Sequence, residues 1–248
     1  MRTSTGLALA LLLTGVGPLG ADDRDAVRTV VAEAIKAHGG EDALAKLRAV
    51  VRKSAGQVTV SGKEVPFAEE HTAQLPERCR RETELRAGAQ KLLVLVVVNG
   101  DKGWQSAGGA VIDVGAARLK ELREDAYAQW LTTLLPLKTD ASLRLAPLPE
   151  AKVNGEPALG VKVSSKGHAD VNLYFEKKSR LLVKSERQAS EGGDTVVKEE
   201  TFSGYKEFDG VKLPTRVVQT VGGKKFSDTT EAAYKFPSKL EEATFGKP

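Results

Sequence analysis

The chain has 248 residues and the composition of a soluble globular protein, with 41% hydrophobic and 28% charged residues. Aromatic residues make up only 5%, so Val, Leu and Ala must supply most of the core. The net charge of +4 comes from Lys and Arg residues that are spread among Glu and Asp without a dense basic run. This spread argues against nucleic-acid binding and leaves room for a weak, transient attraction to an anionic membrane surface.

Residues 1–21 have the pattern of a secretory signal peptide. Arg2 supplies a positive charge, residues 6–17 are apolar, and Pro18 precedes small residues and a polar start. The apolar run of about a dozen residues is shorter than the roughly 20 that a membrane-spanning helix needs. Cleavage is expected after Ala21, or one bond earlier after Gly20. We therefore predict a periplasmic or secreted protein whose residues 22–248 form a single domain.

The mature chain begins with a predicted helix. Apolar residues between positions 27 and 35 recur at spacings of three and four, as on one face of a helix. Gly39 and Gly40 should end it, because glycine readily adopts the left-handed conformation at a helix terminus. A short second helix is expected over residues 41–47. From Val50 the spacing of apolar residues changes to two, which indicates strands.

One of these early strands stands out by its apolar content. Residues 92–98 are seven consecutive apolar residues, which predicts a strand that is buried on both faces. The Asn99-Gly100 pair that follows is a typical hairpin turn. The sequence therefore predicts an antiparallel partner directly after residue 100.

A different pattern occupies the middle of the chain, residues 115–138. It predicts an amphipathic helix that is ended by Pro136. A single helix inside a series of strands has to lie on the sheet. Its apolar residues recur at spacings of three and four and are Leu119, Leu122, Ala126, Trp130 and Leu134, with Tyr127 and Leu131 beside them.

Strands are predicted to resume at Leu143 and to continue almost to the end. Turn residues recur about every dozen positions, as in a long antiparallel meander. The predicted fold is mainly β (α+β): a large curled antiparallel sheet or half-open β-barrel of about 11 strands. It has an N-terminal helix and a central amphipathic helix as lid or plug. Residues 237–248 should form a short helical turn or a loop, with Leu240 and Phe245 able to cover an edge.

Histidine and cysteine residues are too few for a metal site. His38, His71 and His168 are far apart in the sequence, without metal-ligand spacing, and are expected on the surface or in turns. Cys79 is the single cysteine, so no intramolecular disulfide can form. We expect it to be a small buried strand residue, because a nucleophile would need a histidine beside it. No metal and no cofactor are predicted.

No pattern of residues predicts an enzyme. The sequence has no nucleophile elbow, phosphate-binding loop or dinucleotide fingerprint. Carboxylates cluster at residues 121–125 and 198–200, and solvated charge is the better interpretation of both than a general acid/base pair. A secreted hydrolase is therefore the weakest of the hypotheses.

A long twisted sheet must curl, and a curled sheet has a concave face. Either the central helix fills this face as an ordinary core, or a lipid or acyl chain occupies the gap that remains. The candidate ligand-binding residues are Trp104, Trp130, Leu131, Leu134, Tyr174 and Phe175. A core role is open for each of them.

Several segments together resemble one family. They are "AHGGEDALAKLRAVVRKSAGQV" at 37–58, "VNLYFEKKSRLLVKSERQ" at 171–188, "FSGYKEFDGVKLPTRV" at 202–217 and "YKFPSKLEEATFGKP" at 234–248. The chain is similar to bacterial outer-membrane lipoprotein-sorting proteins of the LolA/LolB-like lipoprotein carrier superfamily. The matching hairpin and closing residues are Tyr205, Phe208, Asp209, Gly210, Val211, Lys212, Leu213 and Pro214, then Phe245 and Pro248.

The resemblance implies a half-open antiparallel barrel with a helical lid over a hydrophobic cavity. Carriers of this family bind the acyl chains of lipoproteins and move them across the periplasm. The leading hypothesis is therefore an exported, non-enzymatic carrier, expected to be a monomer, for lipids, lipoprotein acyl chains or another hydrophobic ligand. The alternative is a periplasmic structural or sensory module that binds a protein partner and has a filled cavity.

Overall fold

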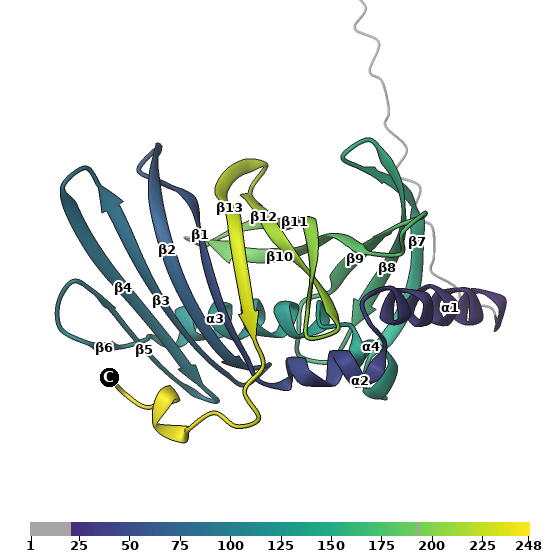
Figure 1. Cartoon of the computed structure of the whole chain (residues 1–248), viewed down its shortest axis with the longest axis horizontal. Coiled ribbons are helices and arrows are strands. Elements are labelled where there is room, and N and C mark those ends of the chain that lie inside the picture. Colours follow the sequence, from purple (N-terminus) through teal and green to yellow (C-terminus); the bar gives the residue numbers. More distant parts are fainter. Residues whose placement is uncertain (1–20, 192) are drawn as a thin grey trace, which may run out of the picture.

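Thirteen antiparallel strands form one curled sheet in the computed structural model, which describes residues 21–191 and 193–248 (Figure 1). The predicted fold class is confirmed, with two more strands than the sequence indicated. The strands are β1 (Val50–Val60), β2 (Lys63–Gln74), β3 (Arg78–Ala87), β4 (Gln90–Asn99), β5 (Lys102–Ala107), β6 (Ile112–Asp113), β7 (Arg144–Val153), β8 (Glu156–Ser164), β9 (Val171–Glu176), β10 (Leu182–Glu191), β11 (Asp194–Phe208), β12 (Val211–Val221) and β13 (Lys224–Lys235).

Short helices precede, interrupt and follow the strands. The helices are α1 (Ala21–Ala37), α2 (Glu41–Leu44), the 3₁₀ helix η1 (Ala45–Arg48), α3 (Ala116–Leu131), α4 (Leu135–Thr139) and the 3₁₀ helix η2 (Glu242–Phe245). The predicted signal peptide, residues 1–21, lies outside the described residues except for Ala21. None of the described helices is long and apolar enough to cross a membrane.

The order of the strands explains why α3 crosses the sheet. The sheet runs β6-β5-β4-β3-β2-β1-β13-β12-β11-β10-β9-β8-β7, so its two edge strands, β6 and β7, follow each other in the chain. The segment between them must pass from one edge to the other, and α3 does so across one face of the sheet (Figure 1). The last strand, β13, then pairs with β1 and joins the two halves.

The pairing register assigns side chains to the two faces. Residues directly opposite each other in an antiparallel pair point to the same face. Arg52 is opposite Tyr234 on one side and His71 on the other, and His71 is opposite Arg81. Gln129 of α3 lies 3.4 Å from His71, so these side chains belong to the face that α3 crosses. We call it the concave face.

The main hydrophobic core occupies the part of the concave face formed by β8–β11. It packs these strands against α1, α2, α3 and α4. Its completely buried side chains include Leu131, Leu134, Leu173 and Phe175. Full burial of such a side chain contributes about 1.5–3 kcal/mol relative to exposure, so this end of the molecule holds the helices in place.

A second, smaller core lies on the opposite, convex face. Trp104 packs there with Leu95, Val97 and Phe245. Phe245 is in η2, so the C-terminal segment covers this face of β3 and β4. The predicted helical turn at the C-terminus is confirmed, although it covers a face of the sheet and not an edge.

Two of the segments that carry the family resemblance meet in space. The helix-ending glycine Gly39 has a φ of +118°, and a Cβ on it would lie 2.0 Å from the carbonyl oxygen of Gly210, in the β11–β12 turn. The backbone N–H of Lys212 donates to the carbonyl of His38 at 3.0 Å. Only glycine fits at position 39, and it lets the end of α1 dock on the hairpin.

Two local predictions were wrong. α3 ends at Leu131, and Pro136 lies in the first turn of α4, where proline is well tolerated. The apolar run at 92–98 is buried only in its second half: Leu92 and Leu93 are 40% and 48% exposed, whereas Val97 and Val98 are buried. The C-terminal segment and α3 cover only that second half.

Candidate functional site: a cavity between the sheet and α3

A cavity of about 790 Å³ lies between the concave face and α3. Small-molecule sites in proteins span a few hundred to about 1,000 Å³, so this one has room for a ligand. One part of its wall is apolar and continuous with the main core. That part includes Leu47, Val50, Val171, Leu182, Phe202 and Val217.

Another part of the wall is charged. It lies beside the apolar part, because apolar and polar residues stand two positions apart on the same strands. The apolar Val50 of β1 is followed two positions later by Arg52, and Val217 of β12 by Gln219. On β11, Glu200 precedes Phe202 in the same way. Side chains two positions apart in a strand point to one face, so apolar and polar groups both face the cavity.

A compact charged cluster of two arginines and one glutamate lies on β1, β2 and β3. The Nη2 of Arg52 donates to Glu69 Oε1 at 2.9 Å, and the Nε of Arg81 lies 3.5 Å from Glu69 Oε2. Thr83 donates to the same carboxylate at 3.2 Å. Burial alone would raise the pKa of Glu69, but the Arg81 and Arg52 guanidinium groups outweigh it and lower the pKa to about 2. Glu69 therefore carries its charge at neutral pH.

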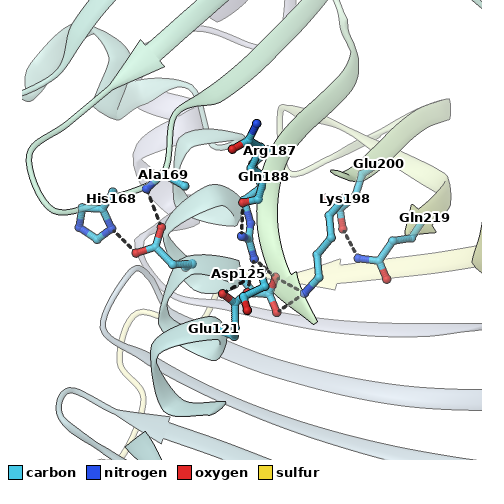
Figure 2. A network of polar contacts seen from close by, with 11 residues as sticks. Glu121, Asp125, His168, Ala169, Arg187, Gln188, Lys198, Glu200 and Gln219 are labelled. Atoms are coloured by element: carbon cyan, nitrogen blue, oxygen red, sulfur yellow. Dashed lines mark hydrogen bonds and ion pairs between the residues drawn. The ribbon is translucent and has the colours of Figure 1, made fainter. Parts of the chain in front are cut away.

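A second charged cluster attaches α3 to β10 and β11 (Figure 2). Asp125 accepts from Arg187 Nη2 at 2.5 Å and from Lys198 Nζ at 3.1 Å. Glu121 lies 3.5 Å from the same Arg187 and accepts from the backbone N–H of Ser190 at 3.1 Å. Two cations and two carboxylates thus join the middle of α3 to the sheet.

Glu124 fixes α3 to the loop before β9. Its carboxylate lies 3.0 Å from His168 Nδ1 and accepts from the backbone N–H of Ala169 at 3.0 Å (Figure 2). The His168 ring also stacks on Tyr127, with 3.8 Å between ring centroids. The prediction that the carboxylates at 121–125 are solvated was therefore wrong, because all three bind groups on the sheet side.

Glu200 lines the cavity and forms no ion pair among the described residues. It accepts a hydrogen bond from Gln219 at 3.4 Å (Figure 2). Burial raises the pKa of Glu200, and the positive charges of Arg52 and Arg81 only partly oppose this. Solvated charge was predicted for residues 198–200 as well, yet Lys198 and Glu200 both line the cavity.

His71 does not lie where the sequence suggested, because it is 1% exposed and within β2. His38 is 4% exposed, but it lies in the turn that follows α1, which agrees with the expected turn position. His38 donates from Nδ1 to the carbonyl of Ala34 at 2.8 Å and accepts at Nε2 from the N–H of Leu182 at 3.4 Å. Burial lowers the pKa of both histidines, so both rings are uncharged at neutral pH. Their role is therefore structural. His168 is half-buried at the end of the turn that begins at Ser165, as expected of a surface or turn residue.

The structure places the six predicted ligand-binding residues away from the cavity lining. Leu131, Leu134 and Phe175 are fully buried in the main core, and Trp130 packs against that core. Trp104 lies in the convex-face core, and Tyr174 donates to Glu186 at 2.8 Å. Direct ligand contact by these six stays a prediction. The polar lining was missed, although the two-residue spacing of Val50 and Arg52 was a signal for it.

Chemical groups for catalysis or metal binding do not assemble in the described residues. No cluster of His, Cys, Asp or Glu side chains within residues 21–191 and 193–248 is suited to a metal ion. Cys79 is half-buried on β3, and burial raises the pKa of its thiol, which lowers its nucleophilicity at neutral pH.

Comparison with known proteins identifies the fold. No protein-family model and no curated protein sequence matches the chain. Among solved structures, a LolA superfamily protein from Nitrosomonas europaea aligns with a TM-score of 0.55 at 12% identity, over 89% of this chain and 97% of that one. An outer membrane lipoprotein-sorting protein domain from Vibrio parahaemolyticus aligns with a TM-score of 0.55 at 14% identity, over 90% and 97%.

A third similar structure is a DUF1329 family protein from Desulfovibrio piger. It aligns with a TM-score of 0.53 at 14% identity, over 89% of this chain and 97% of that one. Identities this low establish the fold alone. The resemblance that the sequence motifs suggested is confirmed at that level: the chain has the LolA-like fold of the lipoprotein-sorting structures.

Proposed function

We propose that the protein is an exported, non-enzymatic carrier that holds a lipid, a lipoprotein acyl chain or another hydrophobic ligand between the curled sheet and α3. The observation that carries this proposal is the cavity of about 790 Å³, whose apolar wall continues the main core. Each methylene of an acyl chain that leaves water for this wall contributes about 0.8 kcal/mol. The lipoprotein-sorting description of one similar structure supports the same class of ligand.

The mode of attachment of α3 supports its role as the lid of this cavity. The middle of the helix is joined to β10 and β11 by ion pairs and hydrogen bonds of Glu121 and Asp125. The side chains of these ion pairs are only 5–30% exposed, so opening them requires that water or a ligand satisfies the separated charges. Entry and release of a ligand would therefore require these ion pairs to open while the apolar C-terminal end stays packed.

The proposal is tested on the mature protein, expressed from residue 22 and purified without detergent. Mass spectrometry of an organic extract should find co-purified lipid, and a bound neutral fluorophore such as N-phenylnaphthylamine should be displaced by long-chain amphiphiles. A matched preparation of an unrelated exported protein controls for carry-over. Absence of both co-purified lipid and displaceable binding would reject the carrier function in favour of a filled, protein-binding module.

A further inference from the structure

The two charged clusters of the cavity differ in their balance of charge. The cluster at α3 has two cations, Arg187 and Lys198, and two carboxylates, Glu121 and Asp125. The cluster on β1–β3 has two guanidinium groups and a single carboxylate, Glu69. The first cluster is neutral overall, and the second has one excess positive charge.

Hydrogen-bond donors remain free in this second cluster. A guanidinium group has five N–H donors; Arg52 donates one hydrogen bond to Glu69 and also interacts with the side chain of Tyr234. The Nε atoms of Arg52 and Arg81 are buried and have no hydrogen bond, because the approach of Arg81 to Glu69 at 3.5 Å is an ion-pair contact only. The Nη donors that Glu69 and Tyr234 leave over can bind an acceptor supplied by a ligand.

The two arginines reach the cavity through the exposed part of their side chains and not through the two buried Nε atoms. Arg52 and Arg81 both belong to its lining, whereas Glu69 does not. The side chains of the two arginines are 22% and 42% exposed, and that of Glu69 is 12% exposed. The carboxylate therefore lies beneath the guanidinium groups, whose remaining surface faces the open space.

Other charged and titratable groups near the pair do not neutralise it. Glu200 is the closest in effect, but it forms no ion pair in the described part of the chain, and burial favours its neutral form by raising its pKa. Tyr234 donates its hydroxyl proton to the carbonyl of Pro214 at 2.8 Å. His71 is buried and uncharged. Asp125 is occupied by Arg187 and Lys198.

We propose that the cavity selects amphiphiles with an acidic group, a carboxylate or a phosphate monoester, and that Arg52 and Arg81 bind this group. Guanidinium groups match the geometry of both acids. Val50 is two residues from Arg52 on β1, a distance of about 7 Å along a strand, so the chain of the same ligand reaches the apolar wall. The inference rests on the proposed carrier function and specifies the ligand class of that site.

The test compares three probes that share a C12 chain: dodecyl phosphate, laurate and dodecanol. Affinities are measured by displacement of N-phenylnaphthylamine from the mature protein. The wild type should bind the acids at least about tenfold more tightly than the alcohol, since hydrogen bonds to charged groups are the stronger kind. The preference should fall as ionic strength rises. The acid that binds more tightly, dodecyl phosphate or laurate, shows whether the ligand's acidic group is a phosphate headgroup or the carboxylate of a free fatty acid.

Variants locate the acid site. Arg81→Met should lower affinity for the acids about tenfold and leave dodecanol binding unchanged, which also shows that the variant is folded. Arg80→Met is the matched control. Arg80 precedes Arg81 on the same strand, but its side chain lies on the opposite face and forms an ion pair with Glu82. Glu200→Gln should leave binding of the acids almost unchanged, because burial already favours the neutral form of Glu200.

Two results would count against the proposal. Equal affinity for the three probes, or an acid preference that Arg81→Met leaves intact, would overturn the acid site while the carrier function stands. Failure of all three probes to bind, together with no co-purified lipid, would overturn both the acid site and the carrier function.

Discussion

The two ends of α3 are attached to the sheet by different physical means. At its C-terminal end, Tyr127, Leu131 and the following Leu134 are buried in the main core. Nearer its N-terminus, Glu121 and Asp125 bind Arg187 and Lys198, beside the buried Leu122. Ion pairs are screened by salt and depend on pH, whereas apolar burial involves no charge that salt could screen or acid could titrate. The helix is therefore built as an anchor at one end and a releasable contact at the other.

The largest effect is expected at the apolar end. Leu131→Ala removes a side chain that is 0% exposed and should lower the free energy of unfolding by about 2–5 kcal/mol, because a cavity remains in the core. Urea denaturation followed by circular dichroism measures this loss. The matched control is Leu119→Ala at the other end of α3, where the half-buried side chain should cost clearly less. Equal losses would contradict the distinction between the two ends.

A smaller effect is expected at the polar end. Asp125→Asn leaves Arg187 with Glu121 and removes the ion pair of Lys198, and it should cost about 1–3 kcal/mol. Hydrogen exchange should increase in the first turns of α3 and not around Leu131. Asp113→Asn serves as a control, since its ion pair with Lys247 is at the surface and should contribute little. Uniformly faster exchange along α3 would show that the helix moves as one unit.

Low pH should weaken the ionic contact of α3 and leave its apolar contact unchanged. Burial opposes ionisation of Asp125, but Lys198 and Arg187 together lower its pKa below the usual 3.8. A carboxyl with a lowered pKa stabilises the fold fully above its unfolded pKa, and this contribution is lost as the pH falls below about 3.8. The stability deficit of Asp125→Asn should therefore shrink between pH 5 and pH 2 (roughly the range over which this group titrates). The deficit of Leu131→Ala should persist, and urea titrations across this range test both.

The smallest change, in the hydrogen exchange of α3, is expected from added salt. Raising the salt concentration from about 0.05 M to about 1 M shortens the screening length from more than 10 Å to about 3 Å. Exchange at residues 116–125 should rise by a small factor, while residues 127–131 should be unchanged. Hydrogen exchange read by mass spectrometry resolves the two segments. An increase confined to residues 127–131 would contradict the assignment of the ionic contact.

Local patterns predicted the elements of this fold well. The helix before Gly39, the meander and the central helix followed from apolar spacing and turn residues, which act within a few positions of the chain. The errors concern burial. The sequence suggested surface positions for His71, Glu124 and Glu200, because their neighbours in the sequence are polar. Their hydrogen-bond partners are 58, 44 and 19 residues away.

By itself, the sequence determined that the protein is one curled antiparallel sheet with a helix that lies on it, and its motifs indicated the LolA-like fold. Only the tertiary structure decided what faces the cavity. The period of two assigns Arg52 and Val50 to one face, but it does not say which face is concave. That depends on the pairing of β13 with β1 and on the path of α3 between the two edge strands. These contacts bring together residues from distant parts of the chain, and no local pattern encodes them.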